Sequence, residues 1–260
     1  MIIVQWNGRL GNQLFEYAIG RILAEELGYE LISDPLPGFI GTYEAVPGRR
    51  IVNPLYVFQG NILDLNFIRN NKGSLGYGIN GWFQRYEYYR DHKDRIKKWF
   101  RIDPVFSPRI DPEDVVVHVR RTQDQLDFRV PYEINGQSIM MSPDLLSFEW
   151  YDSILSSMPF KRMYICTDVR TDPFLTHFKK FDPIITDYNT LQDYTFMTRF
   201  NRIVTSMSTY SWWAGWLSEA SEVYLPRPDY GAWSKPEMNF NIDEGLRFRF
   251  KEAIRAGTFI

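Results

Sequence analysis

The sequence predicts an α/β protein made of two halves, the second holding a parallel sheet with helices on both faces. From residue 114 onward, short runs of Val and Ile alternate with helical patterns. Strands with continuous apolar runs are those that helices cover on both sides. The N-terminus repeats the strand–turn–helix order, and three prolines within residues 101–114 separate the two regions. We therefore expect halves at 1–110 and 111–260.

The N-terminal half opens on a βαβ pattern. Apolar residues recur at helical spacing from Leu14 to Leu27, and Gly28 is placed as a helix C-cap. Residues 34–80 are rich in Gly, Pro and Asn, which favours loops and small elements. The expected elements are a strand at 2–6, a turn at 7–13, a helix at 14–27 and a strand at 29–33.

The C-terminal half alternates strands and helices regularly. Ligands of such sheets bind beyond the carboxyl ends of the strands. Two α/β halves that face a cleft form the fold known as GT-B. The expected strands are 114–119, 162–166, 183–186, 202–206 and 222–225, and the expected helices are 143–158, 172–181, 190–201 and 208–220.

Composition excludes several classes of protein. The net charge of −2 gives no overall positive field for nucleic acid or anionic membranes. The single cysteine, Cys166, rules out an internal disulfide framework. There is no signal-peptide pattern and no apolar run of roughly 18 residues. We expect a cytoplasmic protein without a transmembrane segment, for which peripheral membrane contact stays open.

The segment VVVHVRR carries His118, Arg120 and Arg121 at the end of a buried strand. Alternate residues of a strand face the same side, so His118 and Arg120 project together. A guanidinium suits the planar oxygens of a diphosphate. Surface ion pairs explain the two arginines equally well.

The segment RIVTSMSTYSWWAGWL places Ser208 and Thr209 at a strand-to-helix junction. Backbone amides and the helix dipole favour anions there, although capping the helix is the commoner task of such hydroxyls. Trp212, Trp213 and Trp216 share a helical face, which indicates core.

Two further segments offer polar groups. The turn NGRLGNQ presents Asn12 at the end of the first strand, but its glycine spacing is not that of the GxGxxG dinucleotide motif. Asp193 lies in the first turn of a helix, where it either caps the helix or accepts hydrogen bonds from a guanine edge. No DxD, GxxxxGK[ST] or GxSxG motif is present, and the three histidines are scattered, so no metal site or cofactor is expected.

Four segments in this order resemble glycosyltransferase family 11, the α-1,2-fucosyltransferases. GRLGNQLFEYA is similar to their N-terminal signature and GWFQRYEYY to their GYFQ stretch. HVRR matches the HxRR motif that they share with α-1,6- and protein O-fucosyltransferases, and STYSWWAGWL matches their STFSWW helix start. The resemblance spans residues 8–217.

The resemblance implies a metal-independent transfer of fucose from GDP-β-L-fucose to an oligosaccharide or glycolipid acceptor. Arg120 would stabilise the departing β-phosphate, with Asp124 as the general base and Asp127 in reserve. The N-terminal half would hold the acceptor and the C-terminal half the donor. The donor-binding residues would be His118, Arg121, Asp168, Asp193, Ser208 and Thr209, joined by Asn12 from the other half.

Two positions depart from the family pattern. Gln123 stands where HxRRxD has its acidic residue, with Asp124 one position later, and Met207 replaces a common Asn. Two alternatives therefore stay open: a different GDP-sugar donor, or a non-catalytic protein that binds GDP or a glycan.

Overall fold

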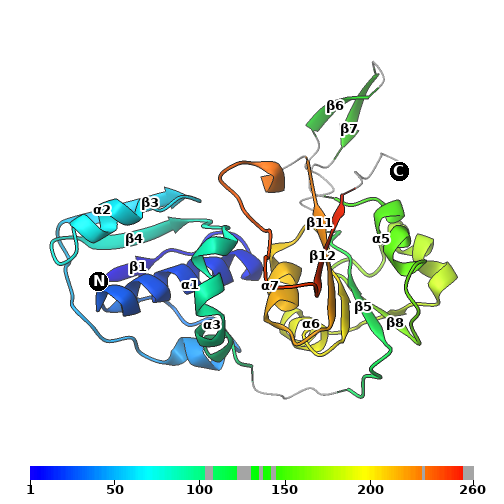
Figure 1. The fold of residues 1–260 in the computed structure, drawn as a ribbon, viewed down its shortest axis with the longest axis horizontal. Coiled ribbons are helices and arrows are strands. Elements are labelled where there is room, and N and C mark those ends of the chain that lie inside the picture. The colour runs from blue at the N-terminus through cyan, green and yellow to red at the C-terminus, as the bar shows by residue number, and fades with distance from the viewer. Residues whose placement is uncertain (103–107, 122–129, 135–136, 142–144, 230–231, 254–260) are drawn as a thin grey trace. The chain divides into compact units, whose positions relative to one another are not determined.

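The computed structural model describes residues 1–102, 108–121, 130–134, 137–141, 145–229 and 232–253. The chain forms two compact units (Figure 1). Unit 1 comprises Met1–Pro104 and Pro236–Asn241, and unit 2 comprises Val105–Lys235 and Ile242–Ile260. The chain thus returns to unit 1 at Pro236–Asn241. The expected single boundary at residue 110 did not include this return.

Unit 1 contains a four-stranded parallel sheet. Its order is β2-β1-β4-β3, and its strands are β1 (Ile2–Val4), β2 (Leu31–Ile32), β3 (Leu55–Gly60) and β4 (Gly76–Gly81). The interpretation of residues 34–80 as loops and small elements was wrong for β3 and β4. The glycines of β4 were read as turn residues, yet a Cβ on Gly76 would collide with the Ile51 carbonyl oxygen. A Cβ on Gly81 would likewise collide with the Gly60 carbonyl oxygen of β3, so these glycines mark close backbone approach.

Helix α1 (Leu10–Leu27) begins inside the expected turn, so Asn12 and Gln13 are helical. It ends as predicted, because Gly28 adopts φ 68° and the Tyr29 amide donates to the Ala24 carbonyl at 2.8 Å. The smaller elements of unit 1 are α2 (Leu65–Asn70), α3 (Lys93–Trp99), and the 3₁₀ turns η1 (Ile40–Tyr43), η2 (Tyr86–Tyr88) and η3 (Arg90–His92).

The returning segment Pro236–Asn241 is tied to unit 1 by backbone hydrogen bonds. The Tyr86 amide donates to the Asn239 carbonyl at 2.7 Å, and the Asn239 amide donates to the Gln84 carbonyl at 2.9 Å. The Phe240 ring lies 6.2 Å from that of Phe15 on α1. These contacts explain why the segment belongs to unit 1.

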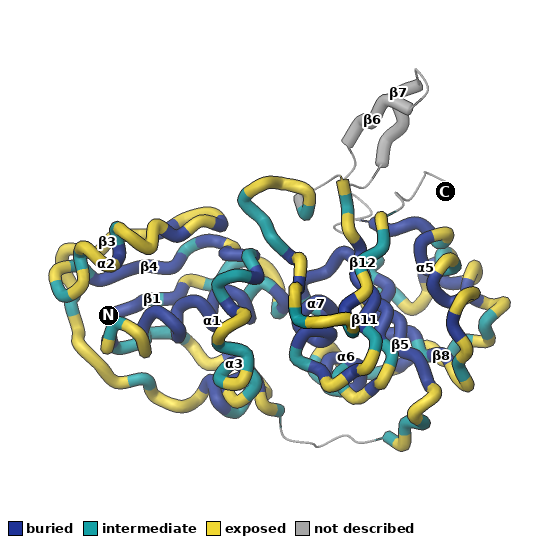
Figure 2. The backbone as a smooth tube through the Cα atoms, viewed as in Figure 1, coloured by how far each residue is buried: buried dark blue, intermediate teal, exposed yellow. Residues whose placement is uncertain are grey.

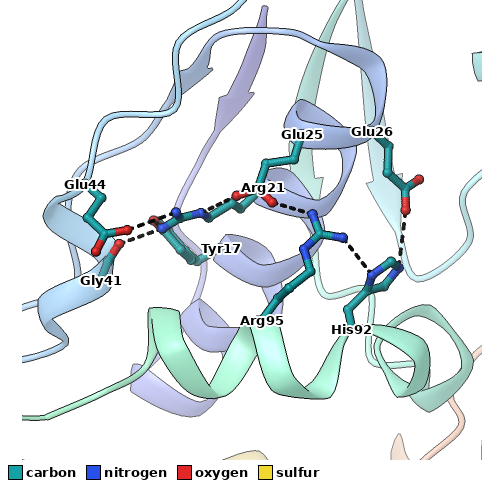
Figure 3. A network of polar contacts seen from close by, with 8 residues as sticks. All are labelled: Tyr17, Arg21, Glu25, Glu26, Gly41, Glu44, His92 and Arg95. Carbon is teal, nitrogen blue, oxygen red and sulfur yellow. Dashed lines mark hydrogen bonds and ion pairs between the residues drawn. The ribbon is translucent and has the colours of Figure 1, made fainter.

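A buried arginine joins α1 to η1 (Figure 3). Arg21 donates to the Gly41 carbonyl at 2.6 Å, to the Tyr17 hydroxyl at 3.1 Å and to the Glu25 carboxylate at 2.8 Å. Its guanidinium also lies 4.8 Å from the centre of the Trp99 ring. The neighbouring Arg95 bonds Glu25 in turn. The charge is therefore buried with its partners satisfied.

We expect Arg21→Ala to destabilise unit 1 by about 3 kcal/mol, because Glu25, Tyr17 and the Gly41 carbonyl lose a common donor. Urea unfolding measures this difference. Arg50→Ala is the control, since Arg50 is exposed and pairs with Glu30 at 3.4 Å. Equal urea midpoints for Arg21→Ala and Arg50→Ala would contradict the stabilising role given to Arg21.

Unit 2 contains a six-stranded sheet in which every pairing is parallel. Its order is β12-β11-β10-β5-β8-β9. If the six strands are numbered 1 to 6 along the chain, the order read from β9 to β12 is 3-2-1-4-5-6. This is the strand order of the doubly wound dinucleotide-binding fold. Strand β12 was not expected. The strands are β5 (Val115–His118), β8 (Met163–Cys166), β9 (Ile184–Ile185), β10 (Arg202–Val204), β11 (Glu222–Arg227) and β12 (Phe248–Glu252).

The helices of unit 2 follow the expected alternation. Trp212, Trp213 and Trp216 are buried, as predicted, and Figure 2 shows α7 in dark blue. An antiparallel hairpin lies between β5 and α5 where no strands were expected. The elements are β6 (Val130–Ile134), β7 (Gln137–Met141), α5 (Phe148–Leu155), η4 (Pro173–Phe181), α6 (Thr190–Met197), α7 (Thr209–Leu217) and η5 (Ala232–Ser234). Within the described ranges no helix has the length and apolar character needed to span a bilayer.

Candidate functional site

The strand order of unit 2 creates a topological switch point between β5 and β10. The chain moves from β5 outward to β9 and then returns to β10 on the other side of β5. Loops that leave two neighbouring strands in opposite directions open a crevice at the carboxyl ends, where doubly wound sheets bind ligands. His118 is the last residue of β5, and the segments after β5 and β10 carry Arg120, Ser208 and Thr209.

His118 ends β5 and is held from two sides. Its Nδ1 lies 2.6 Å from the Ser206 hydroxyl oxygen, and its ring lies 5.4 Å from the Tyr210 ring. Only 6% of His118 is exposed. Neither Ser206 nor Tyr210 was singled out from the sequence. The signal that could have found them is register, because strands β5 and β10 are neighbours in the strand order of the doubly wound fold.

Arg120 reaches across the switch point. One terminal nitrogen of its guanidinium donates to the Met207 carbonyl at 3.2 Å. Met207 immediately precedes Ser208, so the guanidinium lies beside the start of α7. The half-buried position leaves this cation in reach of a ligand at the carboxyl ends of the strands.

Ser208 is the N-cap residue of α7 by backbone conformation, yet its side chain makes no capping hydrogen bond. The Ser211 hydroxyl instead accepts from the Ser206 amide and donates to the Ser208 carbonyl, both at 3.3 Å. No acidic residue lies in the first turn. The first turn of α7 therefore adds no carboxylate of its own to the positive end of the helix.

Arg121 is engaged within unit 2. Its Nε lies 3.0 Å from the Asp172 carboxylate, and its guanidinium lies 4.5 Å from the centre of the Phe174 ring. Its backbone amide donates to the Asp168 carboxylate at 3.3 Å. The ion-pair interpretation thus holds for Arg121, and Arg120 donates to the Met207 carbonyl at the switch point.

Asp193 lies in the first turn of α6 but does not cap it. Asn189 is the cap, and its side chain and that of Gln192 form a capping box. The Asp193 carboxylate accepts from the Thr186 hydroxyl at 2.8 Å. Burial raises the pKa of Asp193 to about 6. A group with this environment can accept hydrogen bonds but carries its charge less readily than an exposed carboxylate.

In unit 1, the two segments that resemble the family signature meet at the ends of β1 and β4. The Asn12 side-chain oxygen accepts from the Gln84 amide nitrogen at 2.9 Å. Glu16 is fully buried and accepts from the Asn7 amide with both oxygens, at 3.1 and 2.9 Å. Burial raises the pKa of Glu16 to about 7. Glu16 was not singled out from the sequence.

Asp124, Asp127 and Gln123 lie outside the described residues, so the predicted general base has no geometry to report. Among the residues that the structure describes, no three His, Cys, Asp or Glu side chains are grouped as a metal ion would require.

Comparison with known proteins supports the fold. Neither a profile of a known protein family nor a curated protein sequence matches the chain. A solved structure described as "Crystal structure of NodZ alpha-1,6-fucosyltransferase soaked with GDP-fucose" is similar, with a TM-score of 0.52 and 12% sequence identity. The match covers 85% of this chain and 93% of that chain. The chain therefore has the predicted α/β, GT-B-like fold, of the kind found in a fucosyltransferase.

Proposed function

We propose that the protein transfers L-fucose from GDP-β-L-fucose to a hydroxyl of an acceptor glycan, with inversion at the anomeric carbon. The observation that carries the proposal is the meeting of Arg120, His118 and the start of α7 at the switch point of unit 2. The similar solved structure, a fucosyltransferase soaked with GDP-fucose, supports the choice of donor.

The chemistry asks for stabilisation of a leaving diphosphate. The acceptor oxygen forms a bond to the anomeric carbon as the bond to the β-phosphate oxygen breaks, and the electron pair leaves with GDP. The Arg120 guanidinium would bind the departing phosphate oxygens. The backbone amides at the start of α7 would add the partial positive charge of the helix dipole. Preorganised charge of this kind is commonly the largest catalytic contribution, and it would replace a metal ion here.

The remaining contacts to the GDP-fucose donor are proposed from the positions of the residues in the fold. His118, oriented by Ser206, would bind the nucleotide, together with Ser208 and Thr209. Asp193 would accept from the guanine edge and Asp168 would hold the loop through the Arg121 amide. Asn12 stays a further predicted donor-binding residue. The acceptor proton would pass to Asp124, with Asp127 in reserve.

The α-1,2 linkage and membership of glycosyltransferase family 11 rest on the four resembling segments. The similar structure is described as an α-1,6-fucosyltransferase, so the fold is compatible with more than one linkage. NMR of the transfer product identifies the linkage directly.

The acidic position that holds Gln123 favours one competing function, a non-catalytic protein that binds GDP or a glycan. Such a protein would bind GDP and neither hydrolyse nor transfer from any GDP-sugar. A transferase with another GDP-linked donor would instead turn over a GDP-sugar other than GDP-fucose. A panel of donors, assayed for release of GDP, separates the three.

Calorimetry tests nucleotide binding. We expect GDP to bind at least tenfold more tightly than UDP. Ser206→Ala should weaken GDP binding by about tenfold, because His118 loses the partner that fixes its ring. Ser221→Ala is the control, since Ser221 is exposed and its hydroxyl donates to the Asn201 carbonyl at 3.0 Å. Equal affinity for GDP and UDP would reject the proposed donor class.

A further inference from the structure

Strand β3 is an edge strand of the unit 1 sheet, and its surroundings are apolar. It pairs with β4 on one side only, because the strand order is β2-β1-β4-β3. Residues 51–63 carry no charge, and Figure 2 shows most of β3 in yellow. Exposed apolar patches of this kind mark interaction sites. The large apolar residues that are 40% or more exposed here are Val52, Leu55, Tyr56, Val57, Ile62 and Leu65.

The backbone of β3 presents a row of hydrogen-bonding groups on its outer side. The Pro54 carbonyl, which directly precedes the strand, accepts from the Gly76 amide of β4 at 3.0 Å. Alternate residues of a strand direct their backbone groups to opposite sides, so the even-numbered residues bond β4. The N–H and C=O groups of Leu55, Val57 and Gln59 therefore face away from the sheet. In the part of the chain that the structure describes, no strand pairs with them.

The other edges of the two parallel sheets are protected. The β2 edge is covered, since the Leu31 amide donates to the Val46 carbonyl at 3.0 Å. Strand β9 is two residues long, and β12 carries the charged residues Arg249 and Lys251. Covered, short and charged edges are the usual protection against pairing with another chain. The edge of β3 is long, apolar and uncharged, which indicates that a partner strand covers it.

We infer that β3 pairs antiparallel with β3 of a second copy of the chain, so that the two unit 1 sheets become continuous. With a twofold axis at Val57, each Leu55 lies opposite Gln59 of the partner subunit. Each outward N–H then meets an outward carbonyl, because directly opposed residues of an antiparallel pair exchange both bonds. A twofold interface requires a surface that complements itself. An uncharged strand meets this requirement, since no like charges lie opposite one another.

The extent of the apolar surface favours a second copy over a short extended peptide. The six exposed apolar residues leave a patch on the order of 500 Å² per copy, and a standard interface buries roughly 800 Å² per partner. A peptide strand would cover β3 alone. The twofold axis instead brings the start of one β3 to the end of the other, so Val52 lies toward Ile62 of the partner subunit. Both residues are exposed, 62% and 60% respectively.

Sedimentation velocity of the intact chain, from about 1 to 100 μM, tests the inference. We expect a reversible dimer of twice the chain mass of 30.9 kDa. Leu55→Lys combined with Gln59→Lys places like charges opposite each other twice, and should raise the dissociation constant about 100-fold or more. Leu55→Lys combined with Gln59→Glu places opposite charges at the same positions. This variant should dimerise within about tenfold of the unaltered protein.

Ile184→Lys is the matched control, since Ile184 is 45% exposed on β9, an edge strand of the unit 2 sheet. Its dimer should be as stable as that of the unaltered protein, and thermal unfolding checks that each variant is folded. A monomer at every concentration would overturn the inference, as would assemblies larger than a dimer. Dissociation by Ile184→Lys, or equal dissociation constants for the two double variants, would also overturn it. GDP binding plays no part in this test, so its outcome is independent of the proposed function.

Discussion

Arg120→Ala is expected to lower kcat for transfer by about 10² to 10³-fold, because removing one group that stabilises charge in a transition state has effects of this size. The guanidinium lies beside the start of α7, where a departing β-phosphate would gather charge. Arg120→Lys should recover only part of the rate, since an ammonium keeps the charge but lacks the two-pronged geometry. Steady-state release of GDP from GDP-fucose, with and without acceptor, measures both variants.

Arg199→Ala is the matched control for Arg120, because Arg199 is an exposed arginine of the same unit. It should transfer fucose at the rate of the unaltered protein. Folding of Arg120→Ala is checked by thermal unfolding, because the variant loses the hydrogen bond to the Met207 carbonyl. Near-normal turnover by a folded Arg120→Ala variant would refute the role of this residue.

Glu16→Gln is expected to change how the stability of unit 1 depends on pH. Burial raises the pKa of Glu16 from 4.5 in the unfolded chain to about 7 in the folded one. Between these values the folded protein keeps a proton that the unfolded chain has lost, so stability falls as pH rises. The full contribution is present below pH 4.5 and is lost above pH 7. The loss amounts to roughly 3 kcal/mol, because one pKa unit corresponds to about 1.4 kcal/mol.

The measurement compares the free energy of unfolding of both proteins at pH 4 and pH 8. The amide cannot ionise, so the difference between variant and unaltered protein should move by roughly 3 kcal/mol in favour of the variant. Asp34→Asn, at an exposed carboxylate of unit 1, should show no such change. A parallel pH dependence for Glu16→Gln and the unaltered protein would mean that Glu16 ionises normally in the folded state.

The local sequence pattern predicted an element correctly wherever the conformation of that element depends on its own residues. The Val and Ile runs of β5 and β10 gave a parallel sheet, since only strands covered on both faces lack alternation. Gly28 ended α1 because the left-handed conformation needed there suits glycine. The tryptophans of α7 are buried, as their helical spacing indicated. The polar groups of unit 2 were expected at the carboxyl ends of its strands, where doubly wound sheets bind ligands.

Contacts between distant residues decided what the sequence could not. Strands β3 and β4 were missed because Gly78 and Gly81 of β4 pack closely against Val57 and Gly60 of β3, and a local pattern shows such glycines only as turn residues. The two adjacent arginines bind different segments, as Arg121 contacts Asp172 and Phe174 while Arg120 donates to the Met207 carbonyl. No local pattern distinguishes them.

The same limit applies to the polar partners. The contact of His118 with Ser206 depends on the register between β5 and β10, and the burial of Glu16 depends on what packs around α1. The sequence by itself determined the fold class and the strand ends at which polar residues gather. Which of these residues contact one another was settled by tertiary packing, because desolvation and hydrogen-bond partners come from segments far apart in the chain.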